Sequence, residues 1–547
     1  MVAPSGNSSA EQQAAMRAVD GALRAGDMAQ ACRIAVEAVS RGVENAQLLT
    51  LAAYGRIGAG DDAIALQYAL RAKALSPRSV DVLTVLALCL SRAGRFREAA
   101  GIYDAALKQS PGNLQLRFNR ACALEDMSEI AGARKEFERV LDAQPNHAEA
   151  LAHLANLAAQ RGDANAARDF GTRALRNDPR QIAAALALAM ADIHEKKFDG
   201  ALAQLTPIMG GIATPINRSI AFGLAGDALD GLNKPSEAFA AYTQSNDLLR
   251  SHFKPVYEAP GLETAPARAA RLKDYFREAQ SENWRADKSA NYVSPVETHV
   301  FLVGFPRSGT TLLEQVLASH PDIQSMEERD CLSDAADAFI APPGGLEKLA
   351  KLGTGGLEIY RDAYWKRAAE FGVVPSKPVF VDKLPLNSVL LPLVAKLFPR
   401  AKILFALRDS RDVVLSCFRR RFGMNAQMYE FLTLSGCAAY YVDVMELSVL
   451  YRAKFGLDTH DVRYERIIAA FEEEVRALCL FLNVDWKDEM KAFAARAQRR
   501  SIDTPSAAQV ARGLYADGAG QWRRYAAELQ PAMAVLQPWL MHYGYSE

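Results

Sequence analysis

The residues best suited to chemistry in this chain form a short loop, GFPRSGTT, at residues 304–311. An apolar run at 300–303 precedes the loop and predicts a buried strand, and an amphipathic helix is predicted from Leu312 to Ala318. A loop that leads from a strand into a helix N-terminus binds anions, because free backbone N–H groups and the positive end of the helix dipole meet there. We therefore predict an anion site with Arg307 as its cation.

The same loop differs from the loop that binds nucleotide triphosphates. Gly304 and Gly309 have the spacing of the consensus GxxxxGK[ST], but Thr310 stands where the lysine should be. The cation lies inside the loop instead, at Arg307. A kinase or NTPase therefore remains only an alternative, and another kind of phosphate chemistry is favoured.

Two further strand ends carry charged groups. A short strand predicted at 322–325 is followed by Glu327 and Glu328, and an apolar strand at 378–381 is followed by Asp382 and Lys383. Ligands collect at the carboxyl ends of strands in open α/β sheets, so these side chains are candidates for the same site. The alternatives are a solvated acidic face and a surface lysine.

A third strand, predicted at 403–407, ends at Arg408, and the helix after it carries Ser416. An arginine fork with a hydroxyl suits a second, separate phosphate. Asp409 resembles a magnesium-binding aspartate, but the missing lysine disfavours that interpretation. The run at 419–421, three arginines, is interpreted as a solvated helix end, and Trp522 as a packing residue.

The composition is that of an ordinary globular protein: 50% of the 547 residues are hydrophobic, 23% are charged, and the net charge is zero. This length predicts two or more domains, and the neutral charge argues against a nucleic-acid binder. We expect no secretory signal in MVAPSGNSSAEQQ and no membrane span, because no run reaches the roughly 18 apolar residues required. Seven scattered cysteines without metal-ligand spacing favour free thiols and a cytoplasmic location.

The first 250 residues are internally repetitive, with a period of 34. Three series keep this period: Ala31, Ala65, Ala99, Ala133, Ala167 and Ala201; Ala53, Ala87, Ala121, Ala155 and Ala189; and Pro77, Pro111, Pro145 and Pro179. Small residues at two fixed points and proline at a third resemble the tetratricopeptide repeat, a pair of antiparallel helices. The resemblance implies a solenoid of six to seven units whose groove holds a protein or peptide. A purely structural or oligomerising array is the alternative.

Beyond residue 295 the pattern changes to short apolar runs that alternate with helices, which is typical of an α/β domain with a mainly parallel sheet. The predicted fold is therefore α plus α/β. We expect a repeat solenoid at 10–250, a linker or helical connection at 251–295, and a P-loop-like α/β domain at 296–547.

The motifs of the second half together resemble the sulfotransferases, and most of all the tyrosylprotein sulfotransferases; with the repeats, the chain resembles bacterial tetratricopeptide sulfotransferases. The matching features, in order, are the loop Arg307–Thr311, the pair Glu327-Glu328, Lys383, Arg408 with Ser416, Tyr464, and the segment Ser506–Val510. Two features depart from that pattern. The acidic motif reads MEERD rather than GEETR, and Arg512 stands where the family has lysine.

The resemblance implies a donor, 3′-phosphoadenosine 5′-phosphosulfate, and no metal. It implies that Glu328 is the base, with Glu327 as the second choice, and that Arg307, Lys383 and Ser506 stabilise the leaving oxygen. The residues expected to hold the donor are Arg307, Ser308, Gly309, Thr310, Thr311, Arg408, Ser416, Tyr464 and Arg512. His299 and His320 are weaker candidates for the base, since one precedes its strand and the other lies at a helix stop.

The expected function is transfer of a sulfuryl group to a hydroxyl, most readily a protein or peptide tyrosine held with help of the repeat groove. A glycan, lipid or small-molecule hydroxyl is the alternative acceptor. A repeat scaffold with an inactive sulfotransferase-like or kinase-like domain is the alternative of another class.

Overall fold

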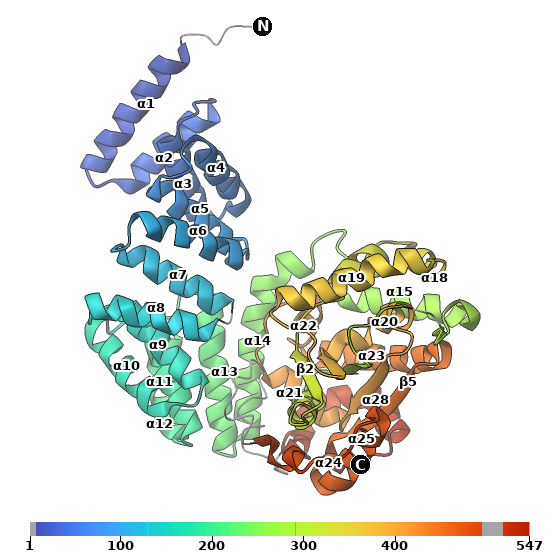
Figure 1. The fold of residues 1–547 in the computed structure, drawn as a ribbon. Coiled ribbons are helices and arrows are strands. Elements are labelled where there is room, and N and C mark those ends of the chain that lie inside the picture. The colour runs from blue at the N-terminus through green and yellow to red at the C-terminus, as the bar shows by residue number, and fades with distance from the viewer. Residues whose placement is uncertain (1–6, 128, 290–291, 495–517, 546–547) are drawn as a thin grey trace. The chain divides into compact units, whose positions relative to one another are not determined.

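The structure, a computed structural model, describes residues 7–127, 129–289, 292–494 and 518–545 (Figure 1). The chain divides into two compact units, residues 1–195 and 196–547. The first unit is helical, and the second contains a sheet.

The first unit is a succession of antiparallel helices. From α2 onward each helix has 13 or 14 residues, and the helices are α1 (Asn7–Arg24), α2 (Met28–Ser40), α3 (Ala46–Gly58), α4 (Asp62–Leu75), α5 (Val80–Arg92), α6 (Phe96–Gln109), α7 (Leu114–Asp126), α8 (Ile130–Ala143), α9 (Ala148–Gln160), α10 (Ala164–Asn177) and α11 (Ile182–His194). This regular alternation confirms the helical repeat that the 34-residue period predicts.

The repeated alanines lie where helices approach closely. Those of both series in this unit are fully buried, for example Ala65 and Ala87 at 0% exposure. A larger side chain there would separate neighbouring backbones. The turn glycines, such as Gly60 with φ +80°, adopt the left-handed conformation that glycine accepts without strain.

The second unit begins with three further helices, α12 (Phe198–Met209), α13 (Pro215–Gly231) and α14 (Pro235–Tyr257). One apolar cluster joins α14 to α21 (Ser410–Arg419) and to the segment near Tyr525; it contains Ala238, Tyr242, Leu415, Phe418 and Leu529. The α13–α14 hairpin thus shares a core with the α/β part of this unit.

The sheet contains five strands in the order β2-β3-β1-β4-β5 in the described part of the chain. The strands are β1 (Thr298–Gly304), β2 (Ile323–Glu327), β3 (Val379–Lys383), β4 (Lys402–Leu407) and β5 (Asp458–Arg463). All four pairs are parallel, which confirms the predicted sheet. In register, Leu302 and Glu327 both pair with Lys383, and Leu407 pairs with Arg463. The residues that follow each strand are therefore gathered at one edge.

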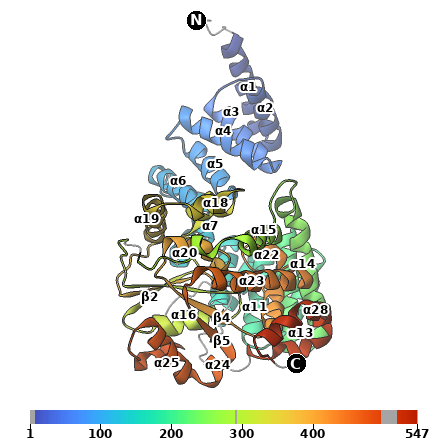
Figure 2. The same ribbon diagram turned by 90° about the vertical axis from the view of Figure 1, so that its right-hand side faces the viewer.

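Alternating side chains of the strands fill two cores, one on each face of the sheet. Helices lie on both sides of the sheet (Figure 2). One face packs on α16 (Thr310–Ala318), α24 (Tyr464–Ala469) and α25 (Phe471–Leu482). The other packs on α15 (Ala265–Glu278), α19 (Thr354–Glu370), α20 (Leu391–Leu397), α23 (Leu434–Phe455) and α28 (Ala526–His542). The sheet is consequently covered on both sides, as parallel sheets require.

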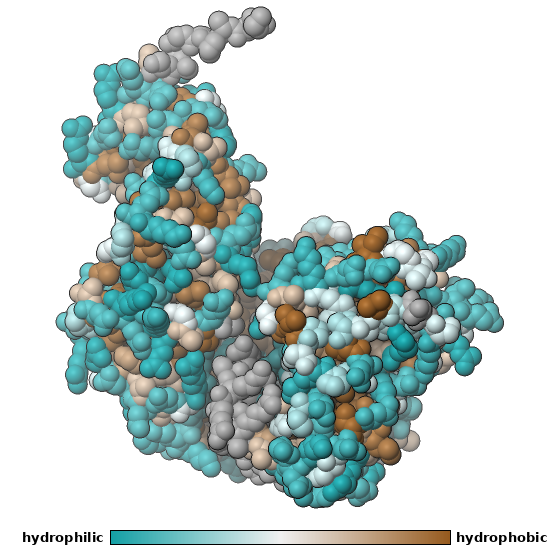
Figure 3. Space-filling view, viewed as in Figure 1, coloured by the Kyte–Doolittle hydropathy of each residue, from teal (hydrophilic) through white to brown (hydrophobic). Residues whose placement is uncertain are grey.

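Shorter elements complete the second unit: η1 (Ser281–Asn283), α17 (Ser333–Ala335), η2 (Ala336–Ile340), α18 (Gly345–Ala350), η3 (Pro385–Ser388), α22 (Ala426–Glu430), η4 (Asp488–Ala492) and η6 (Gln521–Tyr525). Hydrophilic residues cover most of the face seen in Figure 3, and none of the described helices is long and apolar enough to cross a membrane.

Candidate active site

The loop between β1 and α16 has a backbone that only small residues permit at two points. Gly304 has φ +150°, and a Cβ there would lie 2.6 Å from the carbonyl oxygen of Ala406. Gly309 has φ +95°, and a Cβ there would lie 2.7 Å from the Tyr464 ring. The first turn of α16 begins directly after Gly309, so its N–H groups, which have no acceptor within the helix, face the loop. These features fit the predicted anion site.

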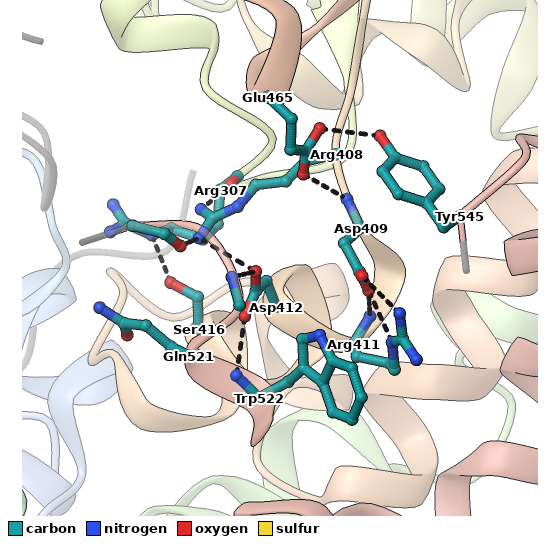
Figure 4. A network of polar contacts seen from close by, with 12 residues as sticks. Arg307, Arg408, Asp409, Arg411, Asp412, Ser416, Glu465, Gln521, Trp522 and Tyr545 are labelled. Atoms are coloured by element: carbon teal, nitrogen blue, oxygen red, sulfur yellow. Dashed lines mark hydrogen bonds and ion pairs between the residues drawn. The ribbon is translucent and has the colours of Figure 1, made fainter. Parts of the chain in front are cut away.

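Arg307 lies inside this loop with φ +70°, in the left-handed region. Its Nε donates to the Ser416 hydroxyl at 3.0 Å, and its carbonyl accepts from Arg408 Nη1 at 2.9 Å (Figure 4). The structure therefore brings Arg307, Arg408 and Ser416 together. In this contact the Ser416 hydroxyl is the acceptor, so its own O–H stays available as a donor for the predicted second phosphate.

Arg408 is held by several groups but keeps an unused donor. Its guanidinium lies over the Tyr464 ring at 4.7 Å and 3.9 Å from Asp412, and Nη2 donates to the Gly518 carbonyl. Its Nε is buried and has no hydrogen-bond partner among the described residues. A buried N–H of this kind is costly unless a ligand accepts from it. This orphaned donor fits the predicted second phosphate.

Asp412 was not singled out by the sequence analysis, although it fixes the start of the C-terminal segment. Its carboxylate accepts from the backbone N–H groups of Gly520 at 2.6 Å and Trp522 at 2.9 Å (Figure 4). The Trp522 ring also stacks against the Arg411 guanidinium at 3.6 Å, which confirms its packing role. The available signal was a second acidic residue, RDSRD, directly after a buried strand.

Asp409 has a structural role in the described residues. Its carboxylate accepts from the Arg411 side chain at 2.7 Å and from the Arg411 backbone N–H at 2.9 Å, so that it caps α21. Its own N–H donates to Glu465 at 3.0 Å. This geometry agrees with the interpretation that disfavoured a magnesium-binding aspartate.

Lys383 is completely buried, so the alternative of a surface lysine is wrong. Its Nζ lies 2.8 Å from Glu328, 3.4 Å from Glu314 and 3.7 Å from Glu327. Burial alone would lower the pKa of Lys383, but Glu314, Glu328 and Glu327 outweigh it and raise that pKa. The ammonium is therefore charged.

Glu314 belongs to this cluster but was overlooked in the sequence. It lies on α16, its side chain is 1% exposed, and burial raises its pKa. A charged residue within the apolar helix TTLLEQVLA was the signal for a buried partner. Lys383 thus joins the helix of the anion loop to the acidic pair.

Glu328 is the member of this cluster that meets solvent, with a side chain 39% exposed. Its φ is +41°, and its N–H donates to the Lys383 carbonyl at 2.8 Å. A residue other than glycine is strained in the left-handed conformation, and the hydrogen bond to β3 maintains this conformation in Glu328. This conformation turns the chain sharply after β2.

A cavity of about 430 Å³ joins the loop to Glu328. Its polar lining includes Arg268, Arg307, Thr310, Thr311, Glu328, Asp330, Ser333, Asp337, Asn387, Asn425 and Gln427, and its apolar lining includes Ile340, Leu386, Leu390, Phe422, Met428 and Tyr440. The candidate anion site and the candidate base therefore face the same space, which is large enough for a ring or a single side chain.

The two histidines considered as bases lie elsewhere. His299 is buried beside Tyr364, with Nε2 3.0 Å from the tyrosine hydroxyl, and burial lowers its pKa to about 3. His320 contacts the carbonyl of Asp485 at 2.7 Å and accepts from the Asp322 N–H, so it stabilises the turn after α16. Neither lines the cavity. Two other predicted site residues, Ser506 and Arg512, lie outside the described residues.

The prediction that 419–421 form a solvated helix end is wrong for Arg419, whose side chain is 9% exposed. Its guanidinium lies between the rings of Tyr242 and Tyr525 and bonds to Asp230 at 2.6 Å. Asp230 also accepts from the Tyr525 hydroxyl at 2.6 Å and pairs with Arg524 at 2.9 Å. One carboxylate on α13 thereby joins the end of α21 to η6.

A parallel α/β domain with a glycine loop after β1, and with cations at neighbouring strand ends, suits the binding of phosphate or sulfate esters. Residues 299–488 match the sulfotransferase family, and residues 53–113 and 118–182 match the tetratricopeptide repeat. The chain therefore carries a sulfotransferase domain and tetratricopeptide repeats, as its motifs predict.

Relatives show how far this similarity reaches. An uncharacterized protein of Aquifex aeolicus is 27% identical over 256 residues, which are 44% of this chain and 33% of that protein. Protein-tyrosine sulfotransferase 1 of Danio rerio is 27% identical over 261 residues, which are 45% of this chain and 72% of that protein. A solved sulfotransferase domain from the curacin biosynthetic pathway is 19% identical, with a TM-score of 0.32, over 46% of this chain and 99% of that domain.

Proposed function

We propose that this protein transfers a sulfuryl group from 3′-phosphoadenosine 5′-phosphosulfate to a hydroxyl, with Glu328 as the base. The observation that carries this proposal is the shared cavity, which is lined by Glu328 and by four loop residues, Arg307, Gly309, Thr310 and Thr311. In-line displacement requires the acceptor and the donor to meet from opposite sides of the transferred group, and such a cavity permits this arrangement.

Two sets of groups support the choice of this donor, one for its 5′-phosphosulfate and one for its 3′-phosphate. The loop N–H groups and Arg307 suit a 5′-phosphosulfate, and the orphaned Nε of Arg408 suits a 3′-phosphate. The donor brings the sulfuryl group, and the chain supplies fixed cations and N–H groups for the charge that builds on the leaving oxygen.

Proton transfer to Glu328 and the positive charge of Lys383 are coupled through one contact. Glu328 is the closest partner of Lys383, at 2.8 Å. As the acceptor O–H bond breaks and the proton moves to the Glu328 carboxylate, this partner loses its charge. The oxygen–sulfur bond to the acceptor forms, the bond to the 5′-phosphate breaks, and Lys383 is then more weakly held when negative charge develops on the leaving oxygen.

A protein or peptide tyrosine is the acceptor we propose. The apolar wall of Leu386, Leu390, Phe422 and Met428 suits an aromatic ring, and several relatives are named protein-tyrosine sulfotransferases. Labelled donor incubated with tyrosine peptides, glycans and simple phenols tests this. Label on glycans alone would contradict the choice of tyrosine.

The base is tested by Glu328→Gln, with Glu327→Gln as its matched control. We expect Glu328→Gln to lower transfer by at least about 100-fold, the range of a lost general base, while 3′,5′-bisphosphate binding stays within about twofold. Equal losses in both variants would contradict the assignment, as would a loss of nucleotide binding in Glu328→Gln alone.

A further inference from the structure

A cysteine, a histidine and a glutamate lie in contact in the first unit, well before the sulfotransferase domain in the sequence. Cys122 and Glu125 lie one turn apart on α7, and His153 lies on α9. The Sγ of Cys122 is 3.9 Å from His153 Nε2, and His153 Nδ1 is 2.7 Å from a Glu125 carboxylate oxygen. A sulfur, an imidazole and a carboxylate that orients the imidazole thus follow one another in contact.

The imidazole ring is held in place by its neighbours. It stacks on Phe137 with ring centroids 4.8 Å apart and an interplanar angle of 16°, and it meets the edge of Phe118 at 5.5 Å. Asn156 donates to the second carboxylate oxygen of Glu125 at 3.5 Å. The histidine therefore has one orientation, with Nε2 toward the sulfur.

The charge state of the ring favours a reactive sulfur. Burial lowers the pKa of His153, but the hydrogen bonds to Cys122 and Glu125 outweigh it and raise that pKa to about 10. A protonated ring donates through both nitrogens, to Glu125 and to Cys122. A cation beside the sulfur stabilises the negative charge that the sulfur carries when it acts as a nucleophile.

Cys122 also differs from the other cysteines in access. All seven lie in the described part of the chain, and Cys122 is the one that is not buried. Burial raises the pKa of Cys89 to about 11 and that of Cys331 to about 12, so these two remain unreactive thiols. The fold therefore favours selective reaction of Cys122 over the buried cysteines.

We propose that Cys122 is a modification site that forms mixed disulfides with small disulfides, with His153 and Glu125 as positioning residues. The Cys122 thiol gives its proton to water and its sulfur attacks one sulfur of the small disulfide, so that the disulfide bond breaks and a new S–S bond forms. The released half leaves as a thiolate and takes a proton from water, so that no other oxidant is consumed.

The test uses the full chain with an aromatic disulfide that releases a coloured thiolate, or with oxidised glutathione, and locates the label by mass spectrometry. We expect label at Cys122 first in the folded protein and at all seven cysteines after unfolding in urea. His153→Asn should slow the reaction of the folded protein with the disulfide by about 10-fold. The loss cannot exceed roughly 30-fold, because an ordinary cysteine is already a few per cent thiolate at pH 7.

His147→Asn is the matched control, because His147 caps α9 through its Nδ1 and asparagine caps helices equally well. It should leave the rate unchanged, and Glu125→Gln should give an intermediate rate. The proposal fails if Cys122 reacts no faster when folded than in urea, or if the His153→Asn and His147→Asn proteins react alike. The urea comparison needs no substitution and decides the outcome even if a variant does not fold.

Discussion

Replacing Asp230 by asparagine removes one charge from the junction of α13, α21 and η6 and keeps the shape of the side chain. Its carboxylate is 16% exposed and accepts from Arg419 and Tyr525 at 2.6 Å each. Asparagine retains one oxygen acceptor, so at least one of these bonds weakens. The positively charged Arg419 guanidinium then lies between two tyrosine rings without a matching anion.

The size of the effect follows from burial. Removing one partner of a buried ion pair costs about 3–5 kcal/mol. The Arg524 side chain is 38% exposed, so its ion pair with Asp230 adds little to the stability, since exposed pairs contribute about 0–1 kcal/mol. Because asparagine keeps part of the hydrogen bonding, we expect a loss of about 3 kcal/mol, or roughly 150-fold in the unfolding equilibrium.

The same substitution should reach the proposed donor site, because α21 carries Ser416 and Asp412, and Asp412 binds the N–H of Trp522 within η6. We expect the affinity for 3′,5′-bisphosphate to fall by about 10-fold, equivalent to about 1.4 kcal/mol. Urea unfolding with and without the bisphosphate measures both quantities.

Asp227→Asn is the matched control, one turn earlier on the same helix. Its carboxylate accepts from the Tyr242 hydroxyl at 2.9 Å and lies 3.8 Å from Arg420, without reaching η6. Its bisphosphate affinity should stay within about twofold of the parent. If Asp230→Asn and Asp227→Asn lose the same stability and the same affinity, Asp230 has no special role in joining α21 to η6.

Three other substitutions test separate parts of the site. Arg408→Ala should weaken 3′,5′-bisphosphate binding several-fold more than 5′-AMP binding in calorimetry, and equal losses would contradict the second phosphate site. Gly309→Ala should lower the affinity for both nucleotides by about 10-fold, because the methyl group would meet Tyr464 at φ +95°, whereas Gly355→Ala, which meets nothing within 4 Å, should not. Asp382→Asn should stabilise the protein more at pH 8 than at pH 5. Burial raises the Asp382 pKa to about 7, against about 3.9 unfolded, so parent stability falls as pH rises between these values, by up to about 4 kcal/mol. Thermal unfolding at both pH values measures this, and an equal shift at both would contradict it.

Local patterns were sufficient to predict the repeat helices, four of the five described strands and the glycine loop between β1 and α16. The alanine period depends on helix contacts that recur every 34 residues, and the strands are short apolar runs with a charged residue at the end, as at Lys383 and Arg408. These features depend on neighbours in sequence, and the parallel register then brings the strand ends together without further information.

Contacts between distant segments could not be predicted in the same way. Arg419 and Asp230 are 189 positions apart, and nothing in the run of three arginines indicates a buried partner on a repeat helix. Glu314 lies 69 positions before Lys383, and its role emerges only when α16 covers the sheet. The contact between Ser416 and Arg307, 109 positions apart, likewise arises only because the loop turns its arginine toward α21.

The division of the helices between the two units bears on how such a chain can change in length. Whole 34-residue repeats before α12 can be gained or lost without exposing the core shared by Leu415, Phe418 and Tyr242. The α13–α14 hairpin cannot be exchanged in this way, since it carries Asp230. A shortened chain that starts at residue 196 keeps that hairpin, whereas one that starts at residue 251 leaves the apolar face of α21 and the cation of Arg419 uncovered. The number of repeats is therefore free to vary without disturbing this core, whereas a change in the last hairpin requires a matching change in the α/β part.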